Sequence, residues 1–310
     1  MEVVKIAEKD IISLRDLSKK EIEAILEKSE EMEKTLQKGK PIETMKGKIM
    51  ATLFFEPSTR TRLSFTSAMQ RLGGTVIDLG ELKATSLVKG ENLADTVRMA
   101  AKYSDVIVIR HPNEGSARFA AQISEKPVIN GGDGANQHPT QTLLDLYAIK
   151  KFKGKIENLN VTLLGDLKHA RVIKSLAYGL AMFGINLTLV SPVGLEFEKE
   201  IVDELKEKFG IKITQTNDIY AGARNADILY ASRIQKERFA DPYEAEKMQK
   251  SFKITPEVLE QGKDSLIIMH ALPRVDEIDY RVDETKYARY FEEAGFGIPV
   301  RMALISLVVQ

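Results

Sequence analysis

The chain has 310 residues, and its 45 lysines and arginines balance its 45 aspartates and glutamates, so the formal net charge is zero. This balance argues against a protein that binds nucleic acid or anionic membrane over its whole surface, because such proteins are usually strongly basic. The absence of cysteine excludes disulfides, cysteine-ligated zinc, iron–sulfur clusters and a thiol nucleophile. Hydrophobic residues make up 43%, enough to form buried cores, and the length indicates about two domains.

We expect a cytoplasmic protein. The first residues mix charges with short apolar runs and lack the apolar core of a signal peptide. No apolar stretch approaches the roughly 20 residues that would span a bilayer. The 4 histidines leave little room for a histidine metal cluster, and we expect neither a metal nor a cofactor.

Helices alternate with short apolar strands along the chain, which favours an α/β fold. The capping box Ser18-Lys19-Lys20-Glu21 predicts the start of an amphipathic helix. The predicted strands lie at residues 48–55, 76–79, 105–110, 127–130, 161–164, 187–190, 211–214, 227–231 and 266–269. Further helices are predicted at residues 62–72, 91–102, 139–150, 169–182, 196–208 and 302–309.

The strands and helices form two series on either side of a polar stretch at residues 151–158, which we expect to link two domains. The pattern predicts two open, doubly wound parallel-sheet domains with the active site in the cleft between them, because ligands of such folds bind beyond the carboxyl ends of the strands. The predicted domains are residues 1–150 and 151–290, with a C-terminal helix over residues 291–310 that packs back on the first domain.

The strongest local signal is Ser58-Thr59-Arg60-Thr61-Arg62, which follows a predicted strand and Pro57 and opens a predicted helix. The first turn of a helix has unpaired N–H groups and a partial positive charge, so hydroxyls and arginines placed there favour a phosphate site. The alternative is that Ser58 only caps the helix and the arginines are solvated. Two arginines among three hydroxyls favour the phosphate site.

Other predicted strand ends also have polar residues: Arg110, the segment His138-Pro139-Thr140-Gln141, and His270. A single histidine beside a helix start is more often a structural hydrogen-bond partner than a catalyst. Together, however, these groups suit a small, doubly charged anion with a carbonyl to polarise. Arg171 and Arg233 in the second series indicate a second anionic substrate. The sequence contains no phosphate-binding loop, dinucleotide fingerprint, nucleophile elbow or zinc helix motif, so no residues suggest covalent or metal-assisted chemistry.

These motifs resemble those of the aspartate/ornithine carbamoyltransferases, and the likeness extends over residues 11–310. Ser58-Thr59-Arg60-Thr61-Arg62 with His138-Pro139-Thr140-Gln141 is similar to the family's carbamoyl-phosphate site. Ornithine-specific members typically carry Ser-Met-Gly and His-Cys-Leu-Pro motifs. Here Ser232-Arg233-Ile234-Gln235 and His270-Ala271-Leu272-Pro273 stand in their places, similar to aspartate-specific members. Arginines also suit a dicarboxylate, whereas they would repel the distal ammonium of ornithine.

The resemblance implies transfer of the carbamoyl group of carbamoyl phosphate to the α-amine of L-aspartate, giving N-carbamoyl-L-aspartate and phosphate early in pyrimidine biosynthesis. Residues implied to bind carbamoyl phosphate are Ser58, Thr59, Arg60, Thr61, Arg110, His138, Gln141, Leu272 and Pro273. Residues implied to bind aspartate are Ser86, Lys89, Arg171, Arg233 and Gln235. The implied catalytic residues are Arg60, Thr61, Lys89, Arg110 and His138.

The family also implies a homotrimer in which a neighbouring subunit lends Ser86 and Lys89 to each active site, and a separate regulatory chain is possible. Glu56 is expected to pair with Arg171 and Arg238 on domain closure. Alternatives that the residues leave open are a carbamoyltransferase for another amine and a non-catalytic protein that binds a phosphorylated metabolite. A nucleic-acid-binding protein is disfavoured by the net charge, and we expect no nucleic acid or membrane partner.

Overall fold

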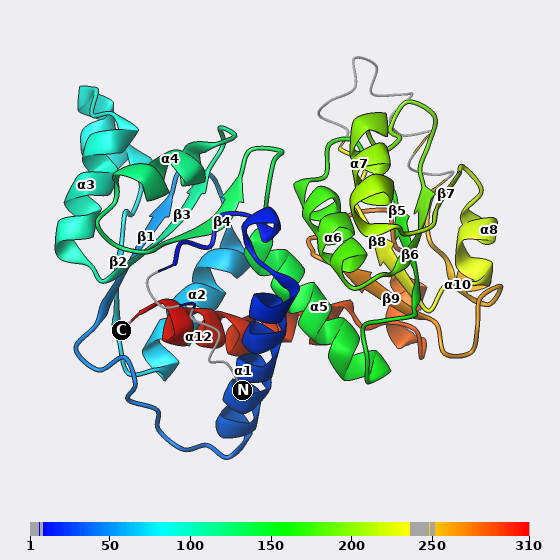
Figure 1. The fold of residues 1–310 in the computed structure, drawn as a ribbon, viewed down its shortest axis with the longest axis horizontal. Coiled ribbons are helices and arrows are strands. Elements are labelled where there is room, and N and C mark those ends of the chain that lie inside the picture. The colour runs from blue at the N-terminus through cyan, green and yellow to red at the C-terminus, as the bar shows by residue number, and fades with distance from the viewer. Residues whose placement is uncertain (1–5, 7–8, 236–247, 249–251, 310) are drawn as a thin grey trace. The chain divides into compact units, whose positions relative to one another are not determined.

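The computed structural model describes residues 6, 9–235, 248 and 252–309, and it divides the chain into two compact units (Figure 1). The first unit comprises Met1–Tyr147 and Phe296–Gln310, and the second comprises Ala148–Gly295. The chain leaves the first unit within helix α5 (Pro139–Lys153) and returns to it between α11 (Tyr290–Gly295) and α12 (Gly297–Val308).

The boundaries differ in two places from those expected from the sequence. The linker predicted at residues 151–158 lies wholly in the second unit, and its first residues continue α5. Lysines in the last turn of α5 favour the helix there because they face the negative end of its dipole. The single helix predicted over residues 291–310 is two helices, since Gly295 and Gly297 flank the break and glycine is a poor helix former.

The first unit contains a four-stranded parallel sheet in the order β2-β1-β3-β4. Its strands are β1 (Ile49–Phe54), β2 (Thr75–Asp78), β3 (Val106–His111) and β4 (Val128–Asp133). A buried apolar cluster joins the sheet to α3 (Leu93–Tyr103) and α4 (Ser116–Ile123) and includes Ala51, Val97 and Ala117. The strand order changes direction between β1 and β3, as in a doubly wound fold.

A second layer of the first unit is formed by α1 (Lys19–Gln37), α2 (Thr59–Arg71) and α12, with α12 in contact with both of the others (Figure 1). The predicted capping box of α1 is confirmed: Ser18 Oγ accepts a hydrogen bond from Glu21 N, and Glu21 Oε2 accepts one from Ser18 N. Helix α12 is apolar on nearly every side and is buried almost throughout, which fits a helix enclosed by neighbours.

The second unit contains a five-stranded parallel sheet in the order β7-β6-β5-β8-β9. Its strands are β5 (Asn160–Leu164), β6 (Asn186–Val190), β7 (Ile213–Thr216), β8 (Ile228–Ala231) and β9 (Ile267–His270). Besides α11, its helices include α6 (Arg171–Met182), α7 (Lys199–Phe209), α8 (Ile219–Arg224) and α10 (Pro256–Leu259). The strand order changes direction between β5 and β8, so the predicted α/β class with two doubly wound parallel sheets is confirmed.

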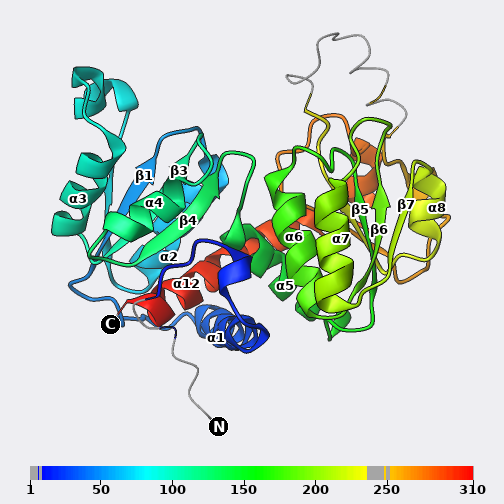
Figure 2. The same ribbon diagram turned by 45° about the horizontal axis from the view of Figure 1, so that its top comes forward.

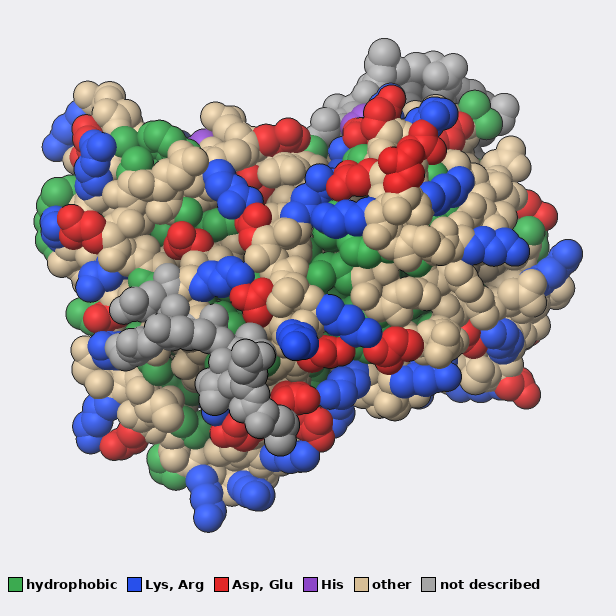
Figure 3. All heavy atoms as spheres, viewed as in Figure 1, with side chains coloured by type: hydrophobic (Ala, Val, Ile, Leu, Met, Phe, Trp, Pro, Cys, Tyr) green, Lys and Arg blue, Asp and Glu red, His purple; other side chains and the backbone are tan. Residues whose placement is uncertain are grey.

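Short 3-10 helices complete the described elements: η1 (Leu14–Asp16), η2 (Leu82–Ala84), η3 (Ser86–Lys89) and η5 (Tyr280–Glu284). Side chains of both charge signs are interspersed over the face seen in Figure 3, in line with the neutral total. Among the described residues, no helix is long and apolar enough to cross a membrane.

Candidate active site

The predicted site residues of the first unit gather where the strand order reverses. Strands β1 and β3 are neighbours with Phe54 opposite Arg110, and Phe55 N donates a hydrogen bond to Arg110 O at 2.8 Å. The segment that leaves β1 therefore starts beside the carboxyl end of β3. This is the position at which open α/β sheets bind ligands.

The N-terminus of α2 lies directly after this point, with Ser58 as its N-cap residue in an extended conformation. Within the described chain, the Ser58 side chain accepts no capping hydrogen bond from the first turn of α2, so the interpretation of Ser58 as a mere cap loses its support. Thr61 is 6% exposed and points into the unit. Partial desolvation lowers the pKa of Arg60, although a guanidinium remains charged at neutral pH.

Arg110 is held by contacts to two neighbouring segments. Its Nε is 2.7 Å from Glu56 Oε1, and its Nη1 donates a hydrogen bond to Gly131 O at 3.3 Å. A Cβ on Gly131 would lie 3.5 Å from Thr61 Cγ2 and 3.2 Å from Ile109 O, so this glycine lets β4 approach both closely. The structure thereby brings Thr61, Arg110 and the end of β4 into one cluster.

His138 follows a loop organised by a buried carboxylate. Asp133, at the end of β4, is 1% exposed. Its oxygens accept hydrogen bonds from two backbone and two side-chain N–H groups, those of Gly115 N, Gln137 N, Asn130 Nδ2 and Asn136 Nδ2. This network fixes the loop that delivers His138, itself 4% exposed, to the start of α5. His138 O then accepts hydrogen bonds from the N–H groups of Gln141 and Thr142.

Two neighbouring groups complete this polar cluster of the first unit. Gln141 lies in the first turn of α5, and its Nε2 donates a hydrogen bond to Asp145 Oδ1 at 2.9 Å. His111, next to Arg110, accepts a hydrogen bond from Asn113 N and contacts Phe55 in a tilted arrangement with ring centroids 4.9 Å apart. Burial lowers the pKa of His111 below its ordinary value, so this imidazole is neutral at pH 7.

The second unit repeats the arrangement at its own reversal point. Gly165 follows β5 with φ +118°, and a Cβ there would lie only 2.0 Å from Ser232 O, so a side chain would separate the ends of β5 and β8. Arg171 is the first residue of α6 after β5, and Arg233 and Gln235 follow β8. All three are half-buried. Arg238 lies outside the described residues, and its predicted pairing with Glu56 stays a prediction.

The turn that carries Leu272 and Pro273 is held by a buried pair. Glu277 Oε1 lies 2.8 Å from His270 Nε2, and His270 Nδ1 accepts a hydrogen bond from Leu272 N at 2.8 Å. A carboxylate only accepts hydrogen bonds, so the proton lies on Nε2. Burial alone would raise the pKa of Glu277, but the hydrogen bond from His270 and those from backbone N–H groups bring it below its ordinary value.

Ser86 and Lys89 lie apart from this cluster. Both are exposed on η3, whose contacts within the described chain include η2. Figures 1 and 2 both show this segment at the outer end of α3, away from α5. The structure of one chain therefore does not join them to the other predicted residues of the first unit.

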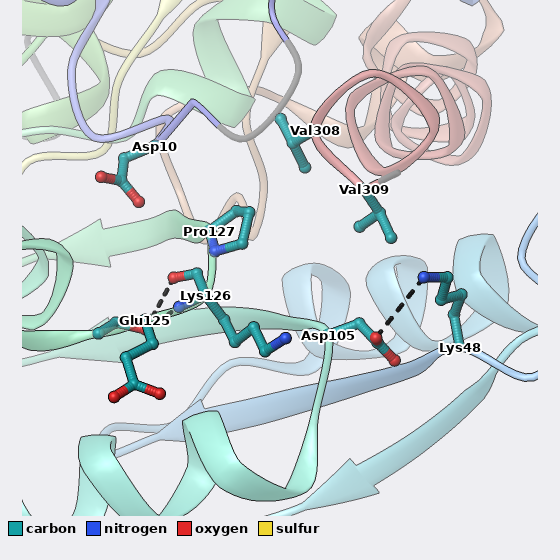
Figure 4. Close-up of a pocket in the computed structure, with 9 residues that line it drawn as sticks. Asp10, Lys48, Asp105, Glu125, Lys126, Pro127, Val308 and Val309 are labelled. Atoms are coloured by element: carbon teal, nitrogen blue, oxygen red, sulfur yellow. Dashed lines mark hydrogen bonds and ion pairs between the residues drawn. The ribbon is translucent and has the colours of Figure 1, made fainter.

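A separate cavity of about 390 Å³ lies at the amino ends of the strands of the first sheet, opposite the predicted site (Figure 4). Lys48 and Asp105, which precede β1 and β3, line it with Nζ and Oδ1 3.7 Å apart, beside Val308 and Val309. Its lining contains none of the predicted site residues. Within the described ranges, no group of three or more His, Asp or Glu side chains is arranged to ligate a metal ion.

Both units of the chain match models of known protein families. Residues 9–151 match the family model "Aspartate/ornithine carbamoyltransferase, carbamoyl-P binding domain", and residues 157–308 match the "Asp/Orn binding domain" of the same family. The chain belongs to the aspartate/ornithine carbamoyltransferase family. The two carbamoyltransferase models thus cover the two sheets separately, one each.

Curated members of the carbamoyltransferase family are similar over nearly the whole length. The aspartate carbamoyltransferase catalytic subunit of Thermococcus kodakarensis is 54% identical over 301 residues, covering 97% of each chain. That of Methanopyrus kandleri is 53% identical over 304 residues, covering 98% of each.

Solved structures of aspartate transcarbamoylases have a fold similar to that of this chain. The catalytic subunit of M. jannaschii aspartate transcarbamoylase has a TM-score of 0.91 at 49% identity, covering 96% of this chain and 97% of that one. Trypanosoma cruzi aspartate transcarbamoylase in complex with carbamoyl phosphate and aspartate has a TM-score of 0.93 at 34% identity, covering 98% of this chain and 96% of that one.

Sequence reasoning missed the residues that support the predicted ones. Asp133, Asp145 and Glu277 are buried and hydrogen-bond to the segments that carry His138, Gln141 and Leu272. A signal for them existed, because charged residues within otherwise apolar or glycine-rich stretches are rarely buried without partners.

Proposed function

We propose that this chain is the catalytic chain of an aspartate carbamoyltransferase. It transfers the carbamoyl group of carbamoyl phosphate to the α-amine of L-aspartate and yields N-carbamoyl-L-aspartate and phosphate, early in pyrimidine biosynthesis. The observation that carries the proposal is the cluster at the β1–β3 reversal, where the hydroxyl-rich N-terminus of α2, including Thr61, lies close to Arg110 and to Gly131 at the end of β4.

The first unit binds carbamoyl phosphate. The N–H groups and hydroxyls at the start of α2 hold the phosphate, supplied by Ser58, Thr59, Arg60 and Thr61. The carbonyl oxygen is polarised by three groups, Thr61, Arg110 and His138. Gln141 binds the carbamoyl NH₂ group together with the Leu272–Pro273 turn of the second unit.

The second unit binds aspartate. Arg171 and Arg233 offer two guanidinium groups beyond the β5–β8 reversal, which suit two carboxylates, and Gln235 adds an amide. An ornithine side chain would bring an ammonium group to the same arginines, and the repulsion selects against it.

The reaction is a direct attack of the neutral α-amine on the carbamoyl carbon. The C–N bond forms, the carbonyl oxygen becomes an oxyanion, and the C–O bond to phosphate then breaks while phosphate takes the proton from the amine. Thr61, Arg110 and His138 stabilise the oxyanion, and each such donor is worth about 3 kcal/mol in a preorganised site. Binding both substrates in the correct orientation supplies much of the remaining rate acceleration.

We propose a homotrimer in which Ser86 and Lys89 of one subunit complete the site of the next, and a cytoplasmic location. The first unit exposes apolar side chains on two short helices in contact, with Val88 of η3 65% and Leu82 of η2 36% exposed, and exposed apolar groups that lie together mark protein interfaces. A separate regulatory chain is a further possible partner.

Mixing His138→Ala and Lys89→Ala chains after dissociation tests the trimer. Shared sites restore activity in the hybrids, whereas self-contained sites do not.

A colorimetric ureido assay tests the reaction. With carbamoyl phosphate, we expect product from L-aspartate and none above background from L-ornithine or N-acetyl-L-ornithine. Activity with ornithine alone overturns the specificity. Ligand binding without turnover by any of the amines points instead to a binding protein on the same fold.

A further inference from the structure

A buried polar cluster lies directly behind Gln141 in the first unit. Gln141 and Asp145 stand one turn apart on α5 and are 8% and 0% exposed. Arg301 of α12 is 3% exposed, and its guanidinium carbon lies 5.1 Å from the ring centroid of the fully buried Phe65 on α2. The cluster therefore links the helix that carries Gln141 to the helix that begins at the phosphate-binding segment.

The contact to Asp145 settles which way the Gln141 amide is turned. Gln141 Nε2 is 2.9 Å from Asp145 Oδ1. An ionised carboxylate can only accept hydrogen bonds, so the NH₂ end of the amide must face Asp145 and the Oε1 end must face the other way. Among the residues that the structure describes, no donor is hydrogen-bonded to Gln141 Oε1.

Arg301 brings a positive charge into the interior near the fully buried Asp145. A nearby opposite charge favours the charged form of a carboxyl group. Burial lowers the pKa of Arg301 to about 10, and the negative charge of Asp145 opposes this effect. Space for the guanidinium comes from Gly297, where a Cβ would lie 2.2 Å from Arg301 Nη1. Within the described chain, Arg301 Nε has no hydrogen-bond partner, so the hydrogen bonds of this guanidinium group are incomplete. A buried pair of opposite charges contributes little net stability compared with apolar side chains.

We propose that Asp145 is a positioning residue that fixes Gln141 with its carbonyl oxygen toward the substrate, and that it thereby makes the site select a carbamoyl group over an acyl group. The inference rests on the proposed function. A carbamoyl NH₂ donates a hydrogen bond to Gln141 Oε1, whereas the methyl group of acetyl phosphate, which has nearly the same shape, leaves that oxygen desolvated without a donor. An amide turned the other way would present its own NH₂ to the carbamoyl NH₂, two donors facing each other, and this discrimination would be lost.

The test is the ratio of two affinities, measured by titration calorimetry on the full-length protein with carbamoyl phosphate and with acetyl phosphate. In Asp145→Asn, the side-chain NH₂ of residue 145 can donate to Gln141 Oε1, which turns the Gln141 amide so that its own NH₂ faces the substrate. We expect carbamoyl phosphate to bind about tenfold more weakly, since one hydrogen bond is lost. Acetyl phosphate affinity stays within about twofold, because it makes no use of Gln141 Oε1.

Two further variants separate this role from a general structural one. Tyr147→Phe removes the hydrogen bond from the same helix to Glu33, so it weakens the packing of α5 and should leave the affinity ratio unchanged. Asp145→Asn combined with Arg301→Gln removes both buried charges together, so no unpaired ion is left if Asp145→Asn alone fails to fold. This double variant should show the same loss of discrimination.

A ratio within twofold of wild type in either folded Asp145 variant overturns the proposal, as does a parallel weakening of both ligands. Failure of the proposed function is distinguishable, because it appears as absence of N-carbamoyl-L-aspartate from the wild-type chain. The affinity ratio needs no turnover and is read independently of that result.

Discussion

The two units are built alike but hold their predicted residues differently. In the first unit, Arg110 contacts the half-buried Glu56 and Gly131 O, and the loop before His138 is held by the buried Asp133. In the second unit, Arg171 begins α6 and Arg233 follows the end of β8, and both are half-buried. The difference indicates that the first unit is preorganised for a reactive group, where small displacements are costly, and that the second unit mainly recognises charge.

The largest expected effect is on the oxyanion cluster of the first unit. Arg110→Gln removes a cationic donor from the carbonyl oxygen, so we expect kcat to fall about 100- to 1,000-fold. Steady-state ureido production measures it. A fall of less than tenfold would mean that the first unit binds substrate without stabilising the transition state.

The hydrogen bonds that hold the loop before His138 are tested by Asp133→Ala. Four buried or half-buried N–H donors lose their acceptor, so the free energy of unfolding should fall by about 3 kcal/mol, and turnover should fall with the displaced His138. Urea denaturation checks the stability. The control is Asp264→Asn, whose side chain is 99% exposed and pairs at the surface with Lys286, and which should leave the urea midpoint unchanged.

Charge recognition by the second unit is tested by Arg233→Ala. We expect the KM for aspartate to rise about 100-fold, because a charge-assisted pair to a carboxylate is lost. The affinity for carbamoyl phosphate, measured by calorimetry without aspartate, should not change. Equal loss of both affinities would break the division of labour between the units.

The smallest effect concerns the His270–Glu277 pair. The pKa of Glu277 is lowered in the folded protein, so its contribution to stability is present above pH 4.5, the ordinary value, and is lost as pH falls through the lowered pKa. Glu277→Gln should lower the free energy of unfolding by about 1.5 kcal/mol at pH 7. It should also make the free energy of unfolding less dependent on pH in this range. Urea midpoints of both proteins between pH 3 and pH 7 measure the difference, and parallel curves would contradict the assignment.

Much of the fold was predictable because its signals are local. The nine predicted strands all match described strands, and the hydroxyl- and arginine-rich segment at Ser58 lies at the predicted helix start. The short helices α4, α8 and α10 were missed, since fewer than nine residues give little periodicity. The supporting contacts could not be predicted, because they join distant residues: Asn130, which donates to Asp133, also binds Ile12 O, and Arg301 lies more than a hundred positions from Asp145.

The most direct test of the central claim is a competition between the two amino acids of the family. The wild-type chain is incubated with carbamoyl phosphate and equal concentrations of L-aspartate and L-ornithine, and the ureido products are identified by mass spectrometry. The account predicts N-carbamoyl-L-aspartate as the enzymatic product, with loss of that product in Arg110→Gln. Citrulline as the main product, or no product above the uncatalysed rate, would contradict it.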